Sequence, residues 1–411
     1  MPGEQTIVGA AAASRATCPT TRSLPATQHD FGGASPPTQG YPMNRTIPLS
    51  DPSVVVVARD PQHLVRPECY APAKAADVIR VGVVGYGYWG PNVVRNVHAL
   101  DNCAVAAICD RSAAALRRAN RIYPGVPLTT DLSEVLTSPD VDAVAVVTPV
   151  WTHFDLAKAA LENGKHVFVE KPFTSTTQQA EELIELAERK NLKLMVDHTF
   201  VFNGAVRKIR ELVDSGTLGA LYYFDSTRVN LGLFQHDVNV VWDLAPHDLS
   251  IMDYIIPQKP QALVATGGRH LNGLADLAFI TVYFPGNVIA HLNVNWLSPV
   301  KVRTTFIGGE QKMLVWNDLE VDEKIKVYDK GVQMTKEGLH ELMVSYCYRS
   351  GDIWAPKVEQ TEALKLELEH FIDCILNDRP PFNDGAAGLR VVKLLEAADE
   401  SLKRRGRLVH L

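Results

Sequence analysis

Asp243 and His247 lie four positions apart in the sequence WDLAPHD, so a helix would carry both side chains on one face. Histidine titrates near neutral pH and exchanges protons with substrates, while a carboxylate one turn away can orient the imidazole or bind a hydroxyl group. Lys171 ends an apolar run in the sequence VFVEKPF, and its ammonium group can stabilise a developing alkoxide. The three side chains suit oxidation of a secondary alcohol. Either His247 or Lys171 can be the base, because neighbouring groups can lower the pKa of a lysine.

These residues also have a purely structural interpretation. Asp243 can cap the helix that follows it, with His247 packed nearby, and Lys171 can be a surface lysine at the end of a strand. Spacing alone favours this interpretation, whereas the motifs upstream favour catalysis. The peptide bond between Lys171 and Pro172 is a candidate for the cis isomer.

Three glycines interrupt an apolar segment in the sequence VGVVGYGYWGPNVVRN. Gly85 permits a tight turn, Gly87 lets a pyrophosphate approach the backbone, and Gly90 lets the following helix pack closely on the strand. The helix N-terminus then offers free N–H groups to the phosphates of a dinucleotide. The loop residues predicted to bind this dinucleotide are Gly85, Tyr86, Gly87, Tyr88, Trp89 and Gly90.

A carboxylate twenty residues after Gly90 bears on the choice of cofactor. Asp110 can accept hydrogen bonds from both ribose hydroxyl groups and would repel a 2′-phosphate, which favours NAD over NADP. The next residue, Arg111, can pair with a 2′-phosphate or stack on the adenine, so NADP stays the less favoured alternative.

Strand-like and helix-like segments alternate between residues 78 and 200. This order predicts an α/β domain in which helices cover both faces of a doubly wound parallel sheet. Residues 201–411 contain β-rich segments joined by short turns, followed by two helical segments, and short connections imply antiparallel neighbours. Residues 342–360 show no regular pattern and are expected to be irregular.

Residues 1–77 are rich in Ala, Ser, Thr, Pro and Gly without hydrophobic periodicity, so we expect a disordered N-terminal extension. Met43 is an alternative start of translation, and a transit peptide is a weaker interpretation of this segment. The net charge of −6 gives no basic field for nucleic acid, and no apolar run approaches the ~20 residues that span a bilayer. The six scattered cysteines have no zinc-binding spacing. A cytoplasmic protein without a metal site, and without nucleic acid or membrane partners, is expected.

From residue 78 to the C-terminus the chain resembles the Gfo/Idh/MocA family of oxidoreductases. Four motifs carry the resemblance in order: the glycine-rich loop, TPVWTH at residues 148–153, EKP at residues 170–172 and WDLAPHD at residues 242–248. The resemblance implies an NAD(P)-dependent dehydrogenase that acts on a sugar or polyol hydroxyl without a metal. It also implies an NAD(P)-binding Rossmann domain at residues 78–200. The domain at residues 201–411 would bind the substrate and carry an open, mostly antiparallel sheet that pairs subunits in a homodimer or homotetramer.

The resemblance also implies individual roles. The family's catalytic residues correspond to Lys171, Asp243 and His247, and its residues near the nicotinamide to Thr148, Pro149, His153, Glu170 and Lys171. Two departures matter. Val241 and Trp242 replace a common Gly-Gly pair, which would change the shape of the cleft, and Pro246 is tolerable only if Asp243 and His247 lie in the first turn of a helix.

The segment before Asp248 is similar to family members associated with oxidation of UDP-N-acetyl-sugars at C3, which makes a nucleotide sugar the leading substrate. An inositol or a free sugar is the alternative within enzymes. A non-catalytic dinucleotide-sensing regulator is the alternative from another class, and the presence of the lysine and of the Asp–His pair argues against it. The predicted substrate contacts are Phe200, Asn203, Arg228, Asn230 and Trp242.

Overall fold

The computed structural model describes residues 78–232, 234–336 and 344–411. Residues 1–77, for which we predicted a disordered extension, and the alternative start at Met43 lie outside the described residues. No helix in the described part of the chain is long and apolar enough to cross a membrane.

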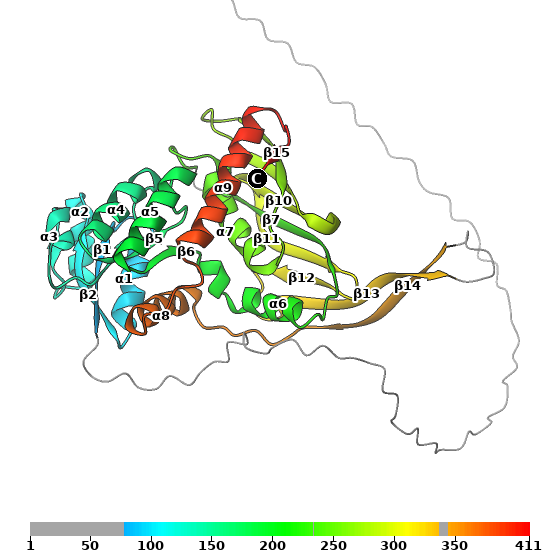
Figure 1. The fold of residues 1–411 in the computed structure, drawn as a ribbon, viewed down its shortest axis with the longest axis horizontal. Coiled ribbons are helices and arrows are strands. Elements are labelled where there is room, and N and C mark those ends of the chain that lie inside the picture. Colours follow the sequence, from blue (N-terminus) through cyan, green and yellow to red (C-terminus); the bar gives the residue numbers. More distant parts are fainter. Residues whose placement is uncertain (1–77, 233, 337–343) are drawn as a thin grey trace, which may run out of the picture. The chain divides into compact units, whose positions relative to one another are not determined.

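A six-stranded parallel sheet forms the first part of the described chain, with the strand order β3-β2-β1-β4-β5-β6 (Figure 1). The two halves of this order wind outward from β1 and β4, so a ligand-binding crevice is expected at their carboxyl ends. The predicted doubly wound parallel sheet is confirmed. Its strands are β1 (Ile79–Val84), β2 (Cys103–Cys109), β3 (Leu128–Thr129), β4 (Ala143–Val146), β5 (His166–Glu170) and β6 (Leu194–Asp197).

Helices cover both faces of this sheet, because successive apolar residues of each strand point in opposite directions. Val83, Ala145 and Phe168 enter a core cluster with α1, whereas Val84 and Val169 enter a second cluster with α4 and α5. The helical elements of this part are α1 (Gly90–Ala99), α2 (Ala113–Ile122), α3 (Leu132–Leu136), η1 (Val150–Thr152), α4 (His153–Glu162) and α5 (Thr177–Lys190).

A nine-stranded sheet follows, with the order β14-β13-β12-β11-β7-β10-β9-β8-β15. All its pairs are antiparallel except β7 with β10, so the predicted mostly antiparallel sheet is confirmed. Its strands are β7 (Leu221–Leu231), β8 (Ala262–Gly268), β9 (Leu277–Tyr283), β10 (Ile289–Asn295), β11 (Leu297–Gly309), β12 (Met313–Asn317), β13 (Ile325–Lys336), β14 (Val344–Trp354) and β15 (Val409–His410).

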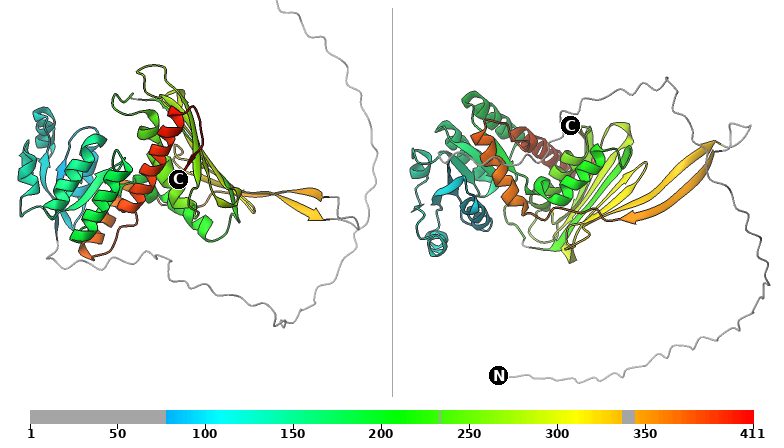
Figure 2. Two further views of the ribbon diagram at one scale, coloured as in Figure 1. Left: turned by 45° about the horizontal axis from the view of Figure 1, so that its top comes forward. Right: turned by 90° about the horizontal axis from the view of Figure 1, so that it is seen from below.

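Helices cover one face of the second sheet, as Figure 2 shows for α7 and α9. Ala290, Leu292 and Val294 of β10 are fully buried on the covered face, as their alternation with polar residues predicts. On the other face, Phe279, Tyr283, Ile289 and Phe306 are exposed, and none of the described helices covers them. The helical elements are η2 (Thr199–Phe202), α6 (Gly204–Asp214), α7 (Val240–Ile255), η3 (Pro285–Asn287), α8 (Ala363–Leu376) and α9 (Gly385–Lys403).

The last two helices return to the first sheet. α8 packs against α1, and α9 packs against α5 and β6 as well as β8. Val196 of β6 also donates a backbone hydrogen bond to the carbonyl of Asn383. The C-terminal segment therefore helps to build the core around the parallel sheet, and the boundary between residues 200 and 201 stays a prediction.

Two local expectations are wrong. The segment 342–360 is not irregular throughout, because residues 344–354 form β14, which pairs antiparallel with β13. Its strand character comes from this partner and not from a local pattern. Pro246 lies in the second turn of α7, because the helix begins at Val240. Asp243 is in the first turn and His247 is not, so the helix accommodates a proline that removes one backbone donor.

Candidate active site

The glycine-rich loop is closely packed on its protein side and open at its centre. A Cβ atom on Gly85 would lie 2.1 Å from the carbonyl oxygen of Val147, and one on Gly90 would lie 2.2 Å from that of Gly85. A Cβ atom on Gly87 would meet nothing within 4 Å. Among the described residues no side chain caps α1. Pro91 has no N–H and the Asn92 N–H donates to the Trp89 carbonyl oxygen, so the Gly90 N–H is the donor of the first turn that is left for a phosphate. This geometry fits a dinucleotide pyrophosphate.

Asp110 directly follows β2 and is hydrogen-bonded to the glycine-rich loop. Its Oδ2 accepts a hydrogen bond from the backbone N–H of Tyr86, and its Oδ1 accepts one from Ser112, both at 2.7 Å. The Tyr86 side chain is buried in the core, and its carbonyl accepts a hydrogen bond from Arg118. The buried side chain leaves only the backbone of Tyr86 to face a cofactor, and the role of this residue in cofactor binding stays a prediction. Tyr88, in contrast, is 86% exposed.

Trp89 faces inward from the loop. Its indole Nε1 donates a hydrogen bond of 2.9 Å to Asp197 Oδ2, at the end of β6. The side chain of Arg111 is exposed beside Asp110 and makes no hydrogen bond or ion pair within the described residues. It is free to meet an adenosine, as the sequence predicts.

The segment of Thr148, Pro149 and His153 lies directly after β4. The ring of His153 is fully buried, with Nδ1 2.8 Å from the carbonyl oxygen of Pro172 and Nε2 2.6 Å from that of Thr148. Burial lowers the pKa of His153, because the charged ring loses its hydration. Both nitrogens face protein carbonyls, and the predicted position of His153 near the nicotinamide stays a prediction. His153 joins the Thr148–Pro149 segment to the strand end that carries Lys171.

Lys171 and Asp243 meet across the carboxyl edge of the parallel sheet. Lys171 Nζ donates a hydrogen bond of 2.9 Å to the Asp243 carbonyl oxygen and lies 3.7 Å from Asp243 Oδ1. The other carboxylate oxygen, Oδ2, accepts a hydrogen bond of 3.1 Å from the indole of Trp296. The Lys171–Pro172 bond is cis. The lysine and aspartate side chains are only 16% and 20% exposed, so their charges interact with little screening by water.

His247 lies one turn after Asp243 on α7. Its ring packs edge-on against Phe200, with the ring centroids 5.1 Å apart. Burial holds the pKa of His247 well below its usual value, and the positive charge of Lys171 lowers the pKa further. A neutral imidazole can accept a proton, and the helix that carries His247 also carries Asp243, the partner of Lys171. The catalytic roles of the three residues stay predictions.

Three carboxyl groups lie in a buried line beside Lys171. The Oε2 atoms of Glu170 and Glu367 are buried and have no hydrogen-bond partner among the described residues. Burial raises the pKa of both glutamates well above the usual value, and the nearby charge of Asp197 raises it further. Burial and this like charge both favour the neutral, protonated form of the two glutamates.

The predicted substrate residues divide into two groups. Phe200 lies against His247, and the Arg228 guanidinium lies 4.5 Å from the Phe200 ring centroid. Arg228 is itself buried and paired with Asp248 at 2.7 Å. Asn230 lies on β7, and within the described residues it makes no hydrogen bond or ion pair with the predicted catalytic residues. The Trp242 indole is buried and donates a hydrogen bond to Asp399 on α9, and the contact of Trp242 with a substrate stays a prediction.

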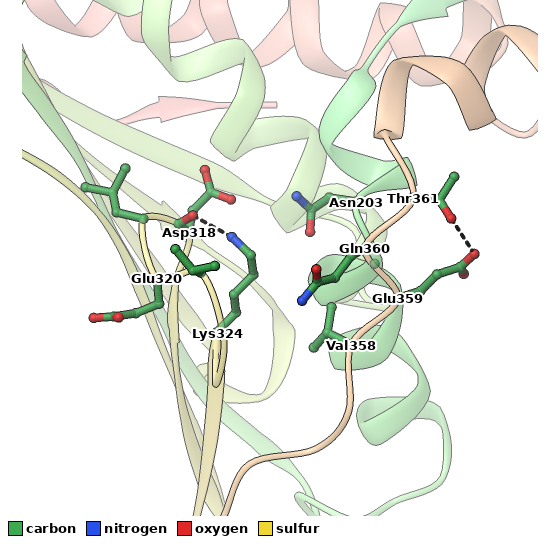
Figure 3. A pocket seen from close by; sticks show the side chains of 11 residues that line it. Asn203, Asp318, Glu320, Lys324, Val358, Glu359, Gln360 and Thr361 are labelled. Carbon is green, nitrogen blue, oxygen red and sulfur yellow. Dashed lines mark hydrogen bonds between the residues drawn. The ribbon is translucent and has the colours of Figure 1, made fainter.

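A cavity of about 360 Å³ opens beside Asn203, which also caps α6 (Figure 3). Its opposite wall contains Lys324, which donates to the carbonyl oxygen of Asp318. The Asp318 carboxylate pairs with Arg303 at 3.3 Å, and the Arg303 guanidinium lies 5.9 Å from the Phe200 ring centroid. The wall of the cavity is thereby connected to the aromatic side chain that packs on His247.

One group in the described part of the chain has metal-ligand spacing. Ligand atoms of His370, Asp373 and Cys374 on α8 lie within 4.8 Å of one another. Asp373 already accepts hydrogen bonds from Arg379 and Asn377. Burial raises the pKa of Cys374 to about 11, which opposes the thiolate that a metal needs. The group lies outside the candidate active site.

Sequence reasoning missed Asp197, Glu367 and Trp296. Asp197 had a usable signal, because it ends an apolar run at the carboxyl edge of the predicted sheet, just as Lys171 follows one. The other two had none. Glu367 lies within an amphipathic helix, and Trp296 follows an alternating strand pattern that indicates only burial.

Comparisons with known proteins agree with this geometry. A family model described as "Oxidoreductase family, NAD-binding Rossmann fold" matches residues 79–198, and one for the GFO/IDH/MocA C-terminal domain matches residues 206–315. The UDP-N-acetylglucosamine 3-dehydrogenase of Acidithiobacillus ferrooxidans is 27% identical over 324 residues, covering 76% of this chain and 94% of that protein. The scyllo-inositol 2-dehydrogenase (NAD(+)) of Bacillus subtilis is 27% identical over 267 residues, covering 61% and 72%.

Solved structures share the fold. The crystal structure of GenD2 from gentamicin A biosynthesis in complex with NAD has a TM-score of 0.70 at 21% identity, covering 84% of this chain and 99% of that one. The matched models cover more than half of the chain, on both sheets. The chain therefore belongs to the Gfo/Idh/MocA family and is an oxidoreductase with an NAD-binding Rossmann domain.

Proposed function

We propose that the chain transfers a hydride between NAD and a secondary hydroxyl group of a sugar, with Lys171, Asp243 and His247 as its catalytic residues. Bound NAD supplies the hydride acceptor. His247 accepts the hydroxyl proton, and in the reverse direction it donates that proton. Lys171 stabilises the negative charge that develops on the substrate oxygen, and Asp243 holds Lys171 in place. The contact of Lys171 Nζ with Asp243, beside a neutral His247, carries the proposal.

The cofactor contacts belong to the same proposal. The backbone of the loop from Gly85 to Gly90 binds the pyrophosphate, and Asp110 with Arg111 binds the adenosine. Thr148 and Pro149 border the nicotinamide. Glu170 acts as a neutral carboxyl group that supports Lys171 from the neighbouring position, since its pKa is raised by burial and by Asp197.

A nucleotide sugar is the proposed substrate class. The UDP-N-acetylglucosamine dehydrogenase named above supports this choice, since it aligns over most of its length. An inositol or a free sugar is the alternative, which the scyllo-inositol dehydrogenase supports. The cavity beside Asn203 provides room for part of a substrate larger than one ring.

The test is NAD reduction followed by absorbance, with UDP-N-acetylglucosamine, other UDP-sugars, free sugars and inositols offered in parallel. We expect turnover with a UDP-N-acetyl-sugar. Turnover restricted to free polyols would reject the nucleotide sugar and leave the dehydrogenase reaction in place. Tight NAD binding without turnover on any member of the panel would favour the dinucleotide-sensing regulator.

We also propose that the open face of the second sheet pairs two copies of the chain. Phe279, Tyr283, Ile289 and Phe306 expose 38–43% of their surfaces on this face. Tyr283 and Ile289 are direct cross-strand partners, so these side chains gather in one patch. A homodimer, or a homotetramer built from such dimers, follows.

A further inference from the structure

The indole of Trp296 reaches the proposed active site from the second sheet. Trp296 occupies the bend between β10 and β11 and is 1% exposed. Its backbone N–H donates to the carbonyl oxygen of Asp276 at 3.0 Å. Phe234 packs edge-on against its ring, with centroids 5.4 Å apart. Both the backbone and the ring are therefore held in place.

The indole N–H has a single function available to it, because indole nitrogen donates and never accepts. It donates to Asp243 Oδ2 at 3.1 Å, while Asp243 Oδ1 lies 3.7 Å from Lys171 Nζ. A buried N–H bonded to a carboxylate is a charge-assisted contact and is directional. One oxygen of Asp243 is thus held by the indole, which turns the other towards the lysine.

We propose that Trp296 is a positioning residue for the reaction, because its indole N–H holds the Asp243 carboxylate in the orientation that presents Oδ1 to Lys171. The inference rests on the proposed function, since it assigns Trp296 a role through Asp243. Without the indole donor the carboxylate is free to rotate away from the lysine. The geometry of Lys171 at the substrate oxygen then loosens, and misplacement by about 1 Å lowers rates by about 100-fold.

The chain offers a matched control in Trp316. This residue is also a buried tryptophan of the second sheet, at 2% exposure, and its Nε1 has no hydrogen-bond partner among the described residues. Loss of the N–H at position 316 therefore breaks no hydrogen bond. Replacing either tryptophan by 3-benzothienylalanine keeps the size of the ring and exchanges the N–H for sulfur, so packing is preserved and only the donor is lost.

The first measurement needs no substrate. In the full chain with nitrogen-15-labelled tryptophan, the indole resonance of Trp296 is assigned by its disappearance in Trp296→Phe. We expect Asp243→Ala to move this resonance upfield and to accelerate its exchange with solvent, without comparable change at Trp316. An unchanged Trp296 resonance in Asp243→Ala would overturn the proposal.

The second measurement uses the panel sugar with the highest turnover, deuterated at the oxidised carbon. With 3-benzothienylalanine at position 296 we expect kcat to fall about 10- to 100-fold, a larger primary isotope effect, and unchanged NAD affinity. The variant at position 316 keeps the parental isotope effect. A purely structural role would lower the melting temperature without changing the isotope effect. Parental kcat at position 296 beside an inactive Lys171→Ala rejects this inference alone, whereas an active Lys171→Ala rejects the proposed site itself.

Discussion

At the scale of single residues, burial and charge influence protonation in the candidate site before any ligand arrives. Burial lowers the pKa of His247 well below its usual value, and the charge of Lys171 lowers it further, which favours the neutral ring. Lys171 is anchored by the backbone carbonyl of Asp243, so its position depends on α7 as well as on its own strand. A base and a cation can therefore coexist a few ångströms from one substrate oxygen.

The first prediction concerns these two groups. Lys171→Ala and His247→Ala should each lower turnover by about 100- to 10,000-fold, the range typical for loss of an acid–base or electrostatic group. NAD affinity, measured by fluorescence titration, should stay nearly unchanged, because the loop that holds the pyrophosphate is intact. Lys158→Ala and His98→Ala are the controls, since these residues lie on α4 and α1 away from the site. Turnover that persists in both test variants would show that the site is assigned to the wrong residues.

The second prediction concerns the buried carboxyl line. The raised pKa of Glu367 means that the folded chain keeps a proton that the unfolded chain releases above its ordinary pKa of 4.5. Its contribution to stability is fully present below that value and is lost as pH rises through the raised folded pKa, by at most about 1.4 kcal/mol per pH unit. Glu367→Gln supplies an N–H donor for Asp197 at every pH and keeps the oxygen that accepts from Asn383.

We therefore expect the melting temperature of Glu367→Gln to fall less than that of the parent between about pH 5 and about pH 9. Glu369→Gln is the control, because its carboxylate lies on the same helix, is 26% exposed and contacts Lys365. Parallel melting curves for the parent and Glu367→Gln across this range would mean that Glu367 is not a proton store.

At the scale of elements, two features of the chain build the site from unusual backbone. The first is the glycine-rich loop. A Cβ atom on either outer glycine would clash with a neighbouring carbonyl group, whereas one on the central glycine would meet nothing within 4 Å. The second is α7, in which Pro246 lacks the N–H that would bond to the carbonyl of Trp242. The next carbonyl, that of Asp243, accepts the hydrogen bond from Lys171. The helix therefore contains a proline close to the carbonyl group of Asp243, which accepts the hydrogen bond from Lys171.

The third prediction separates the glycines of the loop. Gly90→Ala places a Cβ atom 2.2 Å from a backbone oxygen, so both the melting temperature and NAD affinity should fall. Gly87→Ala meets no protein atom within 4 Å, so its melting temperature should match the parent while NAD affinity falls at least about tenfold. The reason is that the added methyl group occupies the face offered to the pyrophosphate.

Gly125→Ala is the matched control for this pair. A Cβ atom there also meets nothing within 4 Å, and the residue lies outside the loop, so neither quantity should change. Calorimetry and a fluorescence titration with NAD measure the two quantities. Full NAD affinity in Gly87→Ala would contradict the assignment of the loop as the phosphate cradle.

At the scale of the whole molecule, the second sheet has two unlike faces. Helices cover one face, whereas the other exposes the apolar side chains of Phe279, Tyr283, Ile289 and Phe306, and exposed apolar patches often mark interaction sites. Figure 2 shows that the helices lie on a single side of this sheet. The asymmetry is what a subunit interface requires, because an uncovered apolar sheet face invites association.

The fourth prediction tests this interface. Phe306→Asp introduces a charge at the β11 side of the patch, directly opposite Asp225 on the neighbouring strand, so like charges repel within the sheet and across the interface. We expect light scattering after size exclusion to show a smaller assembly than the parent, with a dissociation constant raised at least about tenfold. Ile122→Asp, on the exposed side of α2, is the control. An unchanged assembly in Phe306→Asp would move the interface elsewhere.

Much of this molecule was readable from local pattern. The alternation of strands and helices, the glycines between β1 and α1, and the position of Lys171 after β5 all depend on residues near one another in the chain. Hydrophobic period and backbone freedom act over that range, so they indicated the parallel sheet, the phosphate loop and the edge at which ligands gather.

The tertiary structure alone decided which side chains meet. Trp242 turned towards α9 and away from the cleft, and Trp296 turned towards Asp243 across 53 positions of sequence. β14 became a strand because β13 pairs with it. Such contacts depend on how distant elements pack. Hydrogen bonds are directional, so each one forms only after packing has brought its donor and acceptor together. Sequence therefore determined the elements and the chemistry they carry, while packing determined the partners.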